Sequence, residues 1–555
     1  MMAVKATSYC SPTLVLLAFD WPGGQGRNDF LGFAIERTPG FWGHERSWLP
    51  NRIDFDGPGP DGRDKPSRWA PIQKFMWWDA RIDTEDRGKI FHYRVVPIVG
   101  SPENLREAAD EGRTLDVPIP PLADGGVGTY FNRAVVSSQA FARQFPRIET
   151  MAEIAASRAW LANGMEDAVP SFLEAGTAER IEGAIYHLTD DLWVIPALER
   201  FPMGKLSLLY NRTSDDHDSD EAIARLVKAG HPQNLFAIRS KASIMHNKFL
   251  VRVSNARRPE AVLLGSANFT SSGLCQQANV LHTFESPPLA KLYLERKRLL
   301  DGDPTKGQTA AANQGWSEPI ALAGGEARVF FPPEKKPARV SMDRVIQSIR
   351  AAESSVVFCC FIPTDMELIN ACFQAGDDGR MLFGLVNSVE QPSENDPVLE
   401  PKLELYHRSR DHRDVAGKSV FAGDAVPFGF SPELKLLPGE NPLRAIRIHH
   451  KFIVVDAETE QPILYTGSAN LSNNSLYNND ENLLEVVGSR QLADAYLAEF
   501  LRLYEHYRAR IAFNRFQAGD QSTFKLTPDA RWARKYYRQG SPEYKARLAM
   551  VQRVP

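Results

Sequence analysis

The stretch Ile448–Ser472 holds a set of polar side chains that suits chemistry at a phosphate group. His449, Lys451 and Asp456 follow one another as His-x-Lys-x4-Asp, and a Gly-Ser-Ala-Asn run that ends at Asn470 comes after them. A lysine neutralises negative charge, and an amide donates hydrogen bonds to oxygen. A histidine can attack phosphorus or transfer a proton. The pattern therefore predicts catalysis at a phosphate.

A second copy of this pattern lies earlier in the chain, in Ile244–Thr270. It departs from the first at one position, because Val253 stands where the aspartate would be. The two leading histidines are 203 residues apart in the sequence. A duplicated half-site predicts two repeats that face each other and pool their histidines. The polar residues of the earlier copy are His246, Lys248, Ser266 and Asn268, and Ser468 is the serine of the later Gly-Ser-Ala-Asn run.

Apolar segments flank the polar residues of the later copy. Phe452–Val455 and Ile463–Thr466 have the composition of buried strands. The polar residues lie at the ends of these strands, so we expect them to meet at one strand end.

These motifs resemble those of the phospholipase D superfamily, whose mark is His-x-Lys-x4-Asp followed by Gly-Ser-x-Asn. The resemblance covers roughly Gly183 to Ile511. It implies cleavage of a phosphodiester through a phosphohistidine, with no metal and no cofactor. The catalytic residues expected on this basis are His246, Lys248, Asn268, His449, Lys451, Asn470 and Glu481, and those expected to support them are Ser266, Ser468, Asp456 and Asn279.

The two histidines are expected to play different roles. Glu481 stands eleven residues after Asn470, and Asn279 stands eleven after Asn268. In similar family members this position accepts a hydrogen bond from the histidine ring. A carboxylate favours the imidazolium, whereas an amide does not. We therefore expect His246 with Asn279 to be the neutral nucleophile and His449 with Glu481 to be the acid. Tyrosyl–DNA phosphodiesterases resemble this chain in combining an amide with a carboxylate.

The repeats can be matched beyond the motifs. Ile181–Leu198 parallels Ser354–Ala371, and Lys205–Asn211 parallels Met381–Asn387. Each half predicts the order β-α-β-(α)-β-β-α, which favours an α/β sheet covered by helices. We expect two phospholipase D-like repeats packed with pseudo-two-fold symmetry.

The rest of the chain divides by composition. Residues 1–105 carry strand-like runs between Gly/Pro/Asp-rich turns and predict a small antiparallel β-sandwich, weakly similar to fibronectin type III or immunoglobulin modules. It would position a substrate or partner, or serve as a structural cap. The expected units are 1–105 (sandwich), 106–178 (linker and helices), 179–325 (repeat 1), 326–520 (repeat 2, with an insertion at 388–447) and 521–555 (basic tail).

Two segments have both a functional and a structural interpretation. The insertion contains a basic patch, Tyr406–Arg413, and an apolar loop, Val420–Phe430. It would form a lid or substrate wall, or a solvated surface excursion. From Arg531 to Pro555 there are seven Lys or Arg and one acid. This tail would meet phosphates, or pack on the body as a charged helix.

Composition limits the class of protein. The 555 residues are 43% hydrophobic and carry a net charge of −4, so any anion-binding surface must be local. The five cysteines are expected to be reduced core thiols. We find neither a signal peptide nor an apolar stretch long enough to span a membrane. A cytoplasmic location is therefore the default, and export by a route that needs no signal peptide stays open.

Three hypotheses follow for function. The first is a phosphodiesterase acting on a phospholipid headgroup or related small diester, in peripheral contact with a membrane. The second is a nuclease or DNA-repair phosphodiesterase acting on nucleic acid. The third is a non-catalytic binding scaffold. The intact His, Lys and Asn residues of both copies argue against the third, and the first is favoured over the second.

Overall fold

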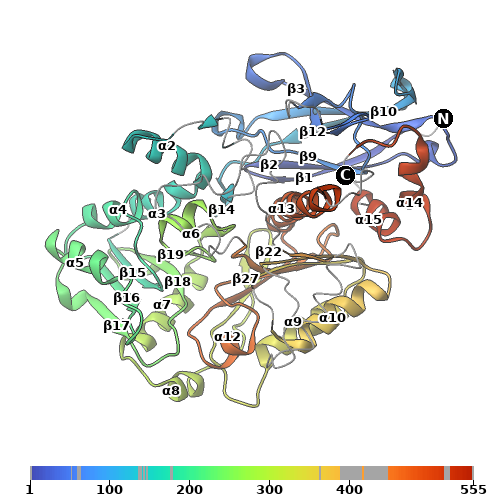
Figure 1. Ribbon diagram of the computed structural model, residues 1–555. Helices are drawn as coiled ribbons and strands as arrows, with labels where there is room; N and C mark the ends of the chain where they lie inside the picture. Colours follow the sequence, from blue (N-terminus) through green and yellow to red (C-terminus); the bar gives the residue numbers. More distant parts are fainter. Residues whose placement is uncertain are drawn as a thin grey trace.

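The computed structural model describes residues 3–51, 53–58, 64–134, 141, 144–145, 148–175, 179–361, 364–387, 415–417, 448–517 and 525–552. Figure 1 shows an all-β part built from the N-terminal residues, packed against two α/β parts that follow it in the sequence. The predicted α/β class is confirmed for the two later parts by their mixed sheets and covering helices.

The N-terminal part consists of two antiparallel sheets. They share a core that includes Val15, Phe19, Phe33 and Tyr93. Their strands are β1 (Lys5–Ser11), β2 (Leu14–Asp20) and β9 (Met76–Asp79) in one sheet, and β3 (Phe30–Thr38), β4 (Ser47–Trp48), β10 (Ile90–Ser101), β11 (Asn104–Glu107) and β12 (Arg113–Pro118) in the other. Two short hairpin-like pairs, β5 (Pro50–Asn51) with β8 (Lys65–Pro66) and β6 (Ile53–Asp54) with β7 (Gly57–Pro58), lie beside them.

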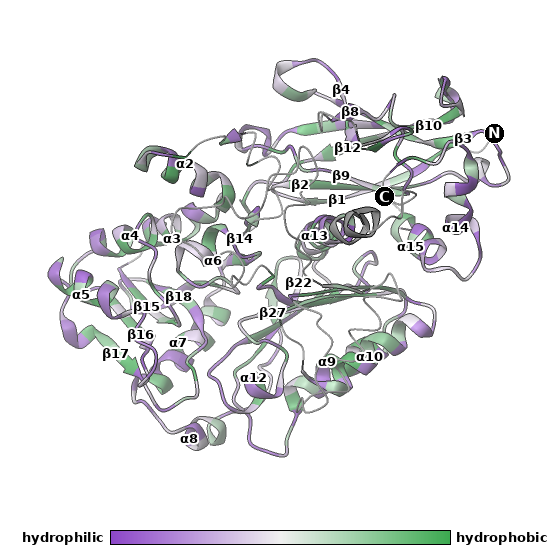
Figure 2. Ribbon diagram, in the orientation of Figure 1, coloured by the Kyte–Doolittle hydropathy of each residue, from purple (hydrophilic) through white to green (hydrophobic). Residues whose placement is uncertain are grey.

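Strand β2 is buried on both faces, which explains its uninterrupted apolar sequence. Val15 and Leu17 point into the core shared with the second sheet. Leu14 and Leu16 point the other way, into the core that also contains residues of the two α/β parts. Figure 2 shows β2 as largely hydrophobic. The N-terminal part is therefore an integral layer of the molecule.

The C-terminal segment returns to this N-terminal layer. It contains a short 3-10 turn (Ala530–Ala533), α14 (Arg534–Tyr537) and α15 (Pro542–Val551). Trp532 donates its indole N–H to the carbonyl of Phe30 at 2.9 Å. Buried Arg547 pairs with Asp20. The tail therefore packs on the body, as one of its two interpretations predicted.

The two α/β parts contain eight-stranded sheets with the same strand order. The first reads β13 (Ala123–Asp124), β14 (Val127–Phe131), β20 (Val280–Phe284), β19 (Pro259–Gly265), β18 (Lys248–Val253), β15 (Arg180–Ile185), β16 (Leu206–Asn211) and β17 (Phe236–Arg239). The second reads β21 (Ile320–Leu322), β22 (Gly325–Phe330), β28 (Leu483–Val487), β27 (Ile463–Gly467), β26 (Lys451–Val455), β23 (Ser355–Cys360), β24 (Met381–Val386) and β25 (Val415–Gly417). Corresponding pairs are parallel or antiparallel alike.

Helices join and cover these strands. The first sheet is accompanied by α2 (Met151–Ala162), α3 (Met165–Glu174), α4 (Val194–Arg200), α5 (Asp220–Lys228), α6 (Ser271–Cys275), α7 (Pro287–Asp301) and α8 (Lys306–Ala311). The second is accompanied by α9 (Val340–Arg350), α10 (Met366–Asp377), α12 (Asn473–Tyr477) and α13 (Arg490–Gln517). In Figure 1, α13 lies between the second sheet and the N-terminal layer. Among the described residues, no helix has the length and apolarity needed to cross a bilayer.

The expected linker at 106–178 contributes strands to two different sheets. Strand β12 pairs with β10 of the N-terminal layer, and β14 pairs with β20 at the edge of the first α/β sheet. The second sheet likewise begins with β21, before the expected boundary at 326. Short strands between Gly and Pro residues give little periodicity, and only their pairing partners define them.

Most of the insertion at 388–447 lies outside the described residues, as do its segments Tyr406–Arg413 and Val420–Phe430. Its one described part is β25, which extends the second sheet.

Candidate active site

Each leading histidine lies two residues before the start of a central strand, and its lysine is the first residue of that strand. His246 and Lys248 introduce β18, while His449 and Lys451 introduce β26. An asparagine at the end of a strand two places away in the sheet, β16 or β24, fixes each approach. Asn211 accepts a hydrogen bond from the amide of Met245 at 2.8 Å, and Asn387 accepts one from that of Ile448 at 3.1 Å.

The two histidine segments reach across to the opposite repeat. The amide of His246 donates to the carbonyl of Asp480 at 2.9 Å, and that of His449 donates to the carbonyl of Ala278 at 3.1 Å. Each is accompanied by a single parallel bridge, Met245 with Asp480 and Ala278 with Ile448. The half-sites therefore meet through reciprocal backbone contacts, as a pseudo-two-fold arrangement would produce.

The ring partners of the histidines are also exchanged between the repeats. His246 Nδ1 lies 2.8 Å from Glu481 Oε2, and His449 Nδ1 lies 3.0 Å from Asn279 Oδ1. The expected pairing within each repeat was wrong. Glu481 and Asn279 lie just before β28 and β20, at the edge where the repeats meet. The eleven-residue spacing identified the right residues, but spacing along one chain does not show which repeat they face.

The serines of the two Gly-Ser-Ala-Asn runs hold these ring partners. Ser468 donates to Glu481 Oε2 at 2.6 Å, and Ser266 donates to Asn279 Oδ1 at 2.8 Å. Each serine also accepts a backbone amide hydrogen bond. Ser475 donates to Glu481 Oε1 at 2.9 Å, so both oxygens of this buried carboxylate are occupied.

The two lysines are buried beside the histidines. Lys248 Nζ donates to the carbonyl of His246, and Lys451 Nζ to that of His449, at 2.5 Å in each case. Burial holds the pKa of Lys248 well below its usual value and lowers the pKa of Lys451 to about 7. An anion bound between them would favour their charged forms.

The asparagines that close the motifs have unused hydrogen-bonding capacity. Among the described residues, the buried Oδ1 atoms of Asn268 and Asn470 have no hydrogen-bond partner. Since an amide oxygen only accepts hydrogen bonds, it is the Nδ2–H groups of these two side chains that would donate to phosphate oxygens.

Burial controls the protonation of the site. His246 and His449 are only 4% and 5% exposed. Burial lowers the pKa of His246 to about 4, despite the opposing charge of Glu481. Burial, then the charges of Lys451 and Lys248, hold the pKa of His449 well below its usual value. Burial opposes ionisation of Glu481, but His246 and Lys248 keep the pKa of that carboxyl below its usual value. Both imidazoles are therefore neutral at pH 7 and Glu481 is ionised.

Asp456 lies outside this cluster, so its expected supporting role at the site is not what its contacts show. It follows β26, whose five residues separate it from Lys451 by roughly 16 Å. Its carboxylate accepts the backbone amides of Glu353, Ser354 and Ser355 at distances of 2.7–3.1 Å. Val253 takes the same place after Lys248, so the departure of the earlier motif does not touch the histidines.

Further residues support the histidines without belonging to the motifs. Buried Arg239 and Arg296 bind the carboxylate of Asp480, whose carbonyl holds His246. Asn132 accepts a hydrogen bond from the backbone amide of Asn279 at 3.0 Å and donates to the carbonyls of Leu274 and Gln277. Asp480 is adjacent to Glu481 in the sequence, which is the one signal that could have indicated it.

One group of described residues has ligands suited to a metal ion. The ligand atoms of His187, Asp216 and Asp218 all lie within 4.8 Å of one another. His187 Nε2 is 2.9 Å from Asp216 Oδ2. The neighbouring Tyr186 packs against the ring of His246. The group lies beside the histidine site but includes none of its His-x-Lys residues.

Comparison with known proteins supports the family resemblance over part of the chain. Residues 345–504 match the family described as "Cardiolipin synthase, PLD-like domain", so this chain contains a phospholipase D-like domain. No curated protein matches the sequence.

Several solved structures are similar at low identity. Phosphatidylserine synthase from Haemophilus influenzae Rd KW20 is 12% identical, with 70% of this chain and 94% of that chain covered and a TM-score of 0.42. Polyphosphate kinase from Porphyromonas gingivalis is 13% identical, with a TM-score of 0.38 and coverage of 66% of this chain. This chain spans only 54% of that kinase. Yeast tyrosyl-DNA phosphodiesterase is 11% identical, with 56% and 83% covered and a TM-score of 0.30.

Proposed function

We propose that this protein is a phosphodiesterase that acts through a phosphohistidine intermediate. The observation that carries the proposal is the crossed arrangement of the half-sites, in which each imidazole is oriented by a residue of the other repeat. Two buried lysines and two asparagines with unused capacity lie in the same motifs. This set binds an anion and supplies both a nucleophile and an acid.

His246 is assigned as the nucleophile, for a reason different from the one expected from the sequence. Its Nδ1–H donates to ionised Glu481, which leaves the Nε2 lone pair available for attack. As the P–N bond forms, positive charge develops on the ring, and the adjacent carboxylate stabilises it.

His449 is assigned as the general acid and base. Asn279 orients its ring without adding charge. A bound phosphodiester anion would raise the pKa of His449 from its low value in the empty site. The imidazolium then gives its Nε2 proton to the leaving oxygen as the P–O bond breaks. In the second step the neutral imidazole of His449 takes a proton from water, whose oxygen attacks phosphorus and breaks the P–N bond, so that His246 leaves as the neutral imidazole.

The substrate class expected from the sequence was a phospholipid headgroup, with nucleic acid as the alternative. The apolar insertion that favoured the phospholipid lies outside the described residues. A specific observation away from the histidines favours nucleic acid and is argued below.

The proposal is tested by trapping the intermediate. Wild-type protein and the variants His246→Ala, His449→Ala and His217→Ala are mixed with a 32P-labelled p-nitrophenyl phosphodiester and quenched in alkali, in which phosphohistidine survives. Label should remain in wild type and in the exposed His217→Ala control, and should be absent from His246→Ala. Turnover with no label in wild type, or label that persists in His246→Ala, contradicts the proposal. No turnover of phospholipid, single-stranded DNA or p-nitrophenyl diester would favour the scaffold hypothesis.

Chelation provides an independent test of the electrostatics. We expect turnover to be unchanged in EDTA, because Lys248 and Lys451 supply the positive charge. Loss of activity in EDTA, with recovery in one divalent ion, would show that metal is required. The variant Asp218→Asn would then identify whether the cluster at His187 holds it.

A further inference from the structure

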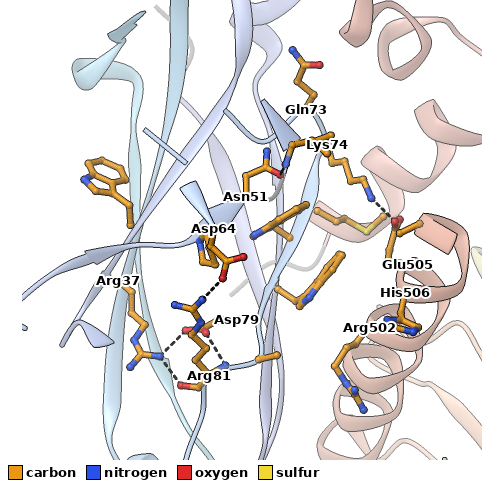
Figure 3. A pocket seen from close by; sticks show the side chains of 18 of the residues that line it. Arg37, Asn51, Asp64, Gln73, Lys74, Asp79, Arg81, Arg502, Glu505 and His506 are labelled. Atoms are coloured by element: carbon orange, nitrogen blue, oxygen red, sulfur yellow. Dashed lines mark hydrogen bonds and ion pairs between the residues drawn. The ribbon is translucent and has the colours of Figure 1, made fainter. Parts of the chain in front are cut away.

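A large pocket lies between the N-terminal layer and the C-terminal helices, away from the histidines (Figure 3). Its volume is about 2230 Å³. Strand β9 and the 39–45 loop contribute to one side, and α13 contributes to the other. None of the described residues that line it belongs to the two His-x-Lys pairs. The proposed phosphodiesterase chemistry therefore leaves this pocket unexplained.

The pocket collects most of the tryptophans of the chain. Six of the ten line it, namely Trp42, Trp48, Trp77, Trp78, Trp160 and Trp532. Trp77 and Trp78 stack on each other, with ring centroids 4.8 Å apart and an interplanar angle of 24°. Neither residue is fully buried, and both line the pocket. Flat aromatic faces of this kind bind other flat rings.

Trp42 is held in an unfavourable backbone conformation with its side chain in solvent. It is 85% exposed, and its φ is +54°. Bulky residues rarely adopt the left-handed region, and solvent exposure of so large an apolar ring gains nothing for the fold. The guanidinium of Arg81 lies 5.2 Å from its ring centroid and pairs with Asp64. The fold thus presents an aromatic ring and a cation together at the pocket.

The charge of the pocket is opposite to that of the protein. Fifteen Lys or Arg and eight Asp or Glu line it, whereas the whole chain has a net charge of −4. Arg534 and Arg538 are among the exposed cations. A local excess of cations with interleaved aromatic rings is the combination that binds single-stranded nucleic acid, because phosphates meet the cations while bases stack on the rings.

We propose that this pocket binds single-stranded nucleic acid at a site separate from the histidines. An inorganic polyanion would use the cations but not the exposed tryptophan rings. An anionic membrane is too flat to enter a recessed pocket. Single-stranded nucleic acid would use both the cations and the aromatic rings, and its backbone is itself a chain of phosphodiesters.

A succession of hydrogen bonds connects the pocket to the histidine site. Arg502, which lines the pocket, donates to the carbonyls of Asn132 and Arg133 at 3.5 Å. Asn132 holds the amide of Asn279, the residue that orients His449. Arg502 therefore connects the pocket to the residue that orients the acid of the proposed reaction.

The test measures binding and does not depend on cleavage. Fluorescence anisotropy of a labelled twelve-nucleotide oligo(dT) is recorded with full-length His246→Ala, so that the probe is not cut. Trp42→Ala should raise the Kd at least about fivefold, the effect of losing one base-stacking partner. The control is Trp69→Ala, which removes another exposed tryptophan of the same layer that does not line the pocket. It should leave the Kd unchanged.

A second variant tests the cations. Arg534→Glu with Arg538→Glu should weaken binding and reduce the slope of log K against log salt by about 1.4, from about 0.7 for each lost phosphate contact. The exposed Arg200→Glu should change neither quantity. Thermal unfolding checks that all variants are folded.

Three results overturn the inference. The first is an oligonucleotide Kd that none of the pocket variants changes. The second is competition by inorganic polyphosphate as effective as that by oligo(dT) of equal charge, which would remove the role of the bases. The third is Trp42-dependent binding to phosphatidylglycerol vesicles without Trp42-dependent binding to oligo(dT). Failure of these binding assays would leave the trapped phosphoenzyme unaffected, so the two proposals are tested separately.

Discussion

The two half-sites of this protein have the same strand order and the same His, Lys, Ser and Asn residues in their motifs, yet their histidines have different partners. His246 donates to a carboxylate from the second repeat, and His449 meets an amide from the first. Duplication provides two equivalent imidazoles, and exchange of ring partners between the repeats makes them inequivalent. The role of each histidine therefore depends on a residue of the other repeat.

The support around the two partners is also unequal. Glu481 accepts from two serines, and the adjacent Asp480 is fixed by two buried arginines of the first repeat. In the first repeat, Ala278 stands where Asp480 stands in the second. The pair of His246 and Glu481 thus has charged residues supporting it, whereas the pair of His449 and Asn279 has no charged residue at the position of Asp480.

The largest expected effect separates the two histidines by their leaving groups. His449→Ala should lose roughly 10²–10⁴-fold in turnover of an alkyl phosphodiester, because the alkoxide needs a proton. With p-nitrophenolate as leaving group, the phosphoenzyme should still form and then persist, since its hydrolysis lacks a base. His246→Ala should lose turnover of both substrates to the same extent, because both reactions need the nucleophile. Rapid-quench measurement of labelled protein distinguishes the two variants. If the adduct is present only in His246→Ala, then His449 is the nucleophile and His246 is the acid.

The next largest effect is expected when the carboxylate that contacts the ring of His246 is replaced by an amide. Glu481→Gln should lower kcat roughly 10²-fold, because the charge that develops on His246 loses its counterion. The pKa of His246 falls further without the carboxylate, so the acidic limb of the pH–rate profile moves to lower pH.

The reciprocal exchange is Asn279→Asp, which places a carboxylate beside His449. It should raise the pKa of His449 and move the alkaline limb to higher pH, because the acid stays protonated longer. Profiles of kcat against pH for the two variants test the crossed pairing directly. If Asn279→Asp instead moves the acidic limb, His449 is not its partner during catalysis.

Much of the site could be predicted from the sequence, because its chemistry is local to short motifs. His246, Lys248, His449 and Lys451 share their positions within the motifs, and two copies make coincidence improbable. The spacing also indicated Glu481 and Asn279. Which histidine each of them contacts could not be predicted, because this depends on how the two repeats pack together and not on the order of residues in either one.

The fold was predictable where strands are long and apolar, and less so at sheet edges. The matched segments of the repeats contain the parallel strands β15, β16, β23 and β24. Strand β14 was placed in a linker, because a five-residue strand after a glycine pair has no periodicity to reveal it. The double burial of β2 was also hidden, since an apolar run does not say which two layers cover it.

A smaller effect concerns Asp456, whose counterpart in the first repeat is Val253. We expect this difference between the repeats to affect stability and not catalysis. Asp456→Asn puts an amide against three backbone N–H donors and should cost about 1–3 kcal/mol. Turnover at 25 °C should stay within about threefold of wild type, while the thermal midpoint falls. The control is Asp110→Asn at an exposed position. A hundredfold loss of kcat with an unchanged midpoint would place Asp456 in the reaction instead.

The smallest effect at neutral pH concerns the residue between histidine and lysine, which is Asn247 in the first repeat and His450 in the second. Burial, then the charges of Lys451 and Arg502, lowers the pKa of His450 to about 3. The unfolded chain takes up this proton below pH 6.5 and the folded protein does not, so stability is lost as pH falls below that value. At pH 5 the loss from His450 amounts to about 2 kcal/mol. His450→Asn, which copies the first repeat, should therefore narrow the gap between thermal midpoints at pH 7 and pH 5. The exposed His217→Asn should leave that gap unchanged, and an unchanged gap in His450→Asn would mean that His450 is accessible to protons in the folded state.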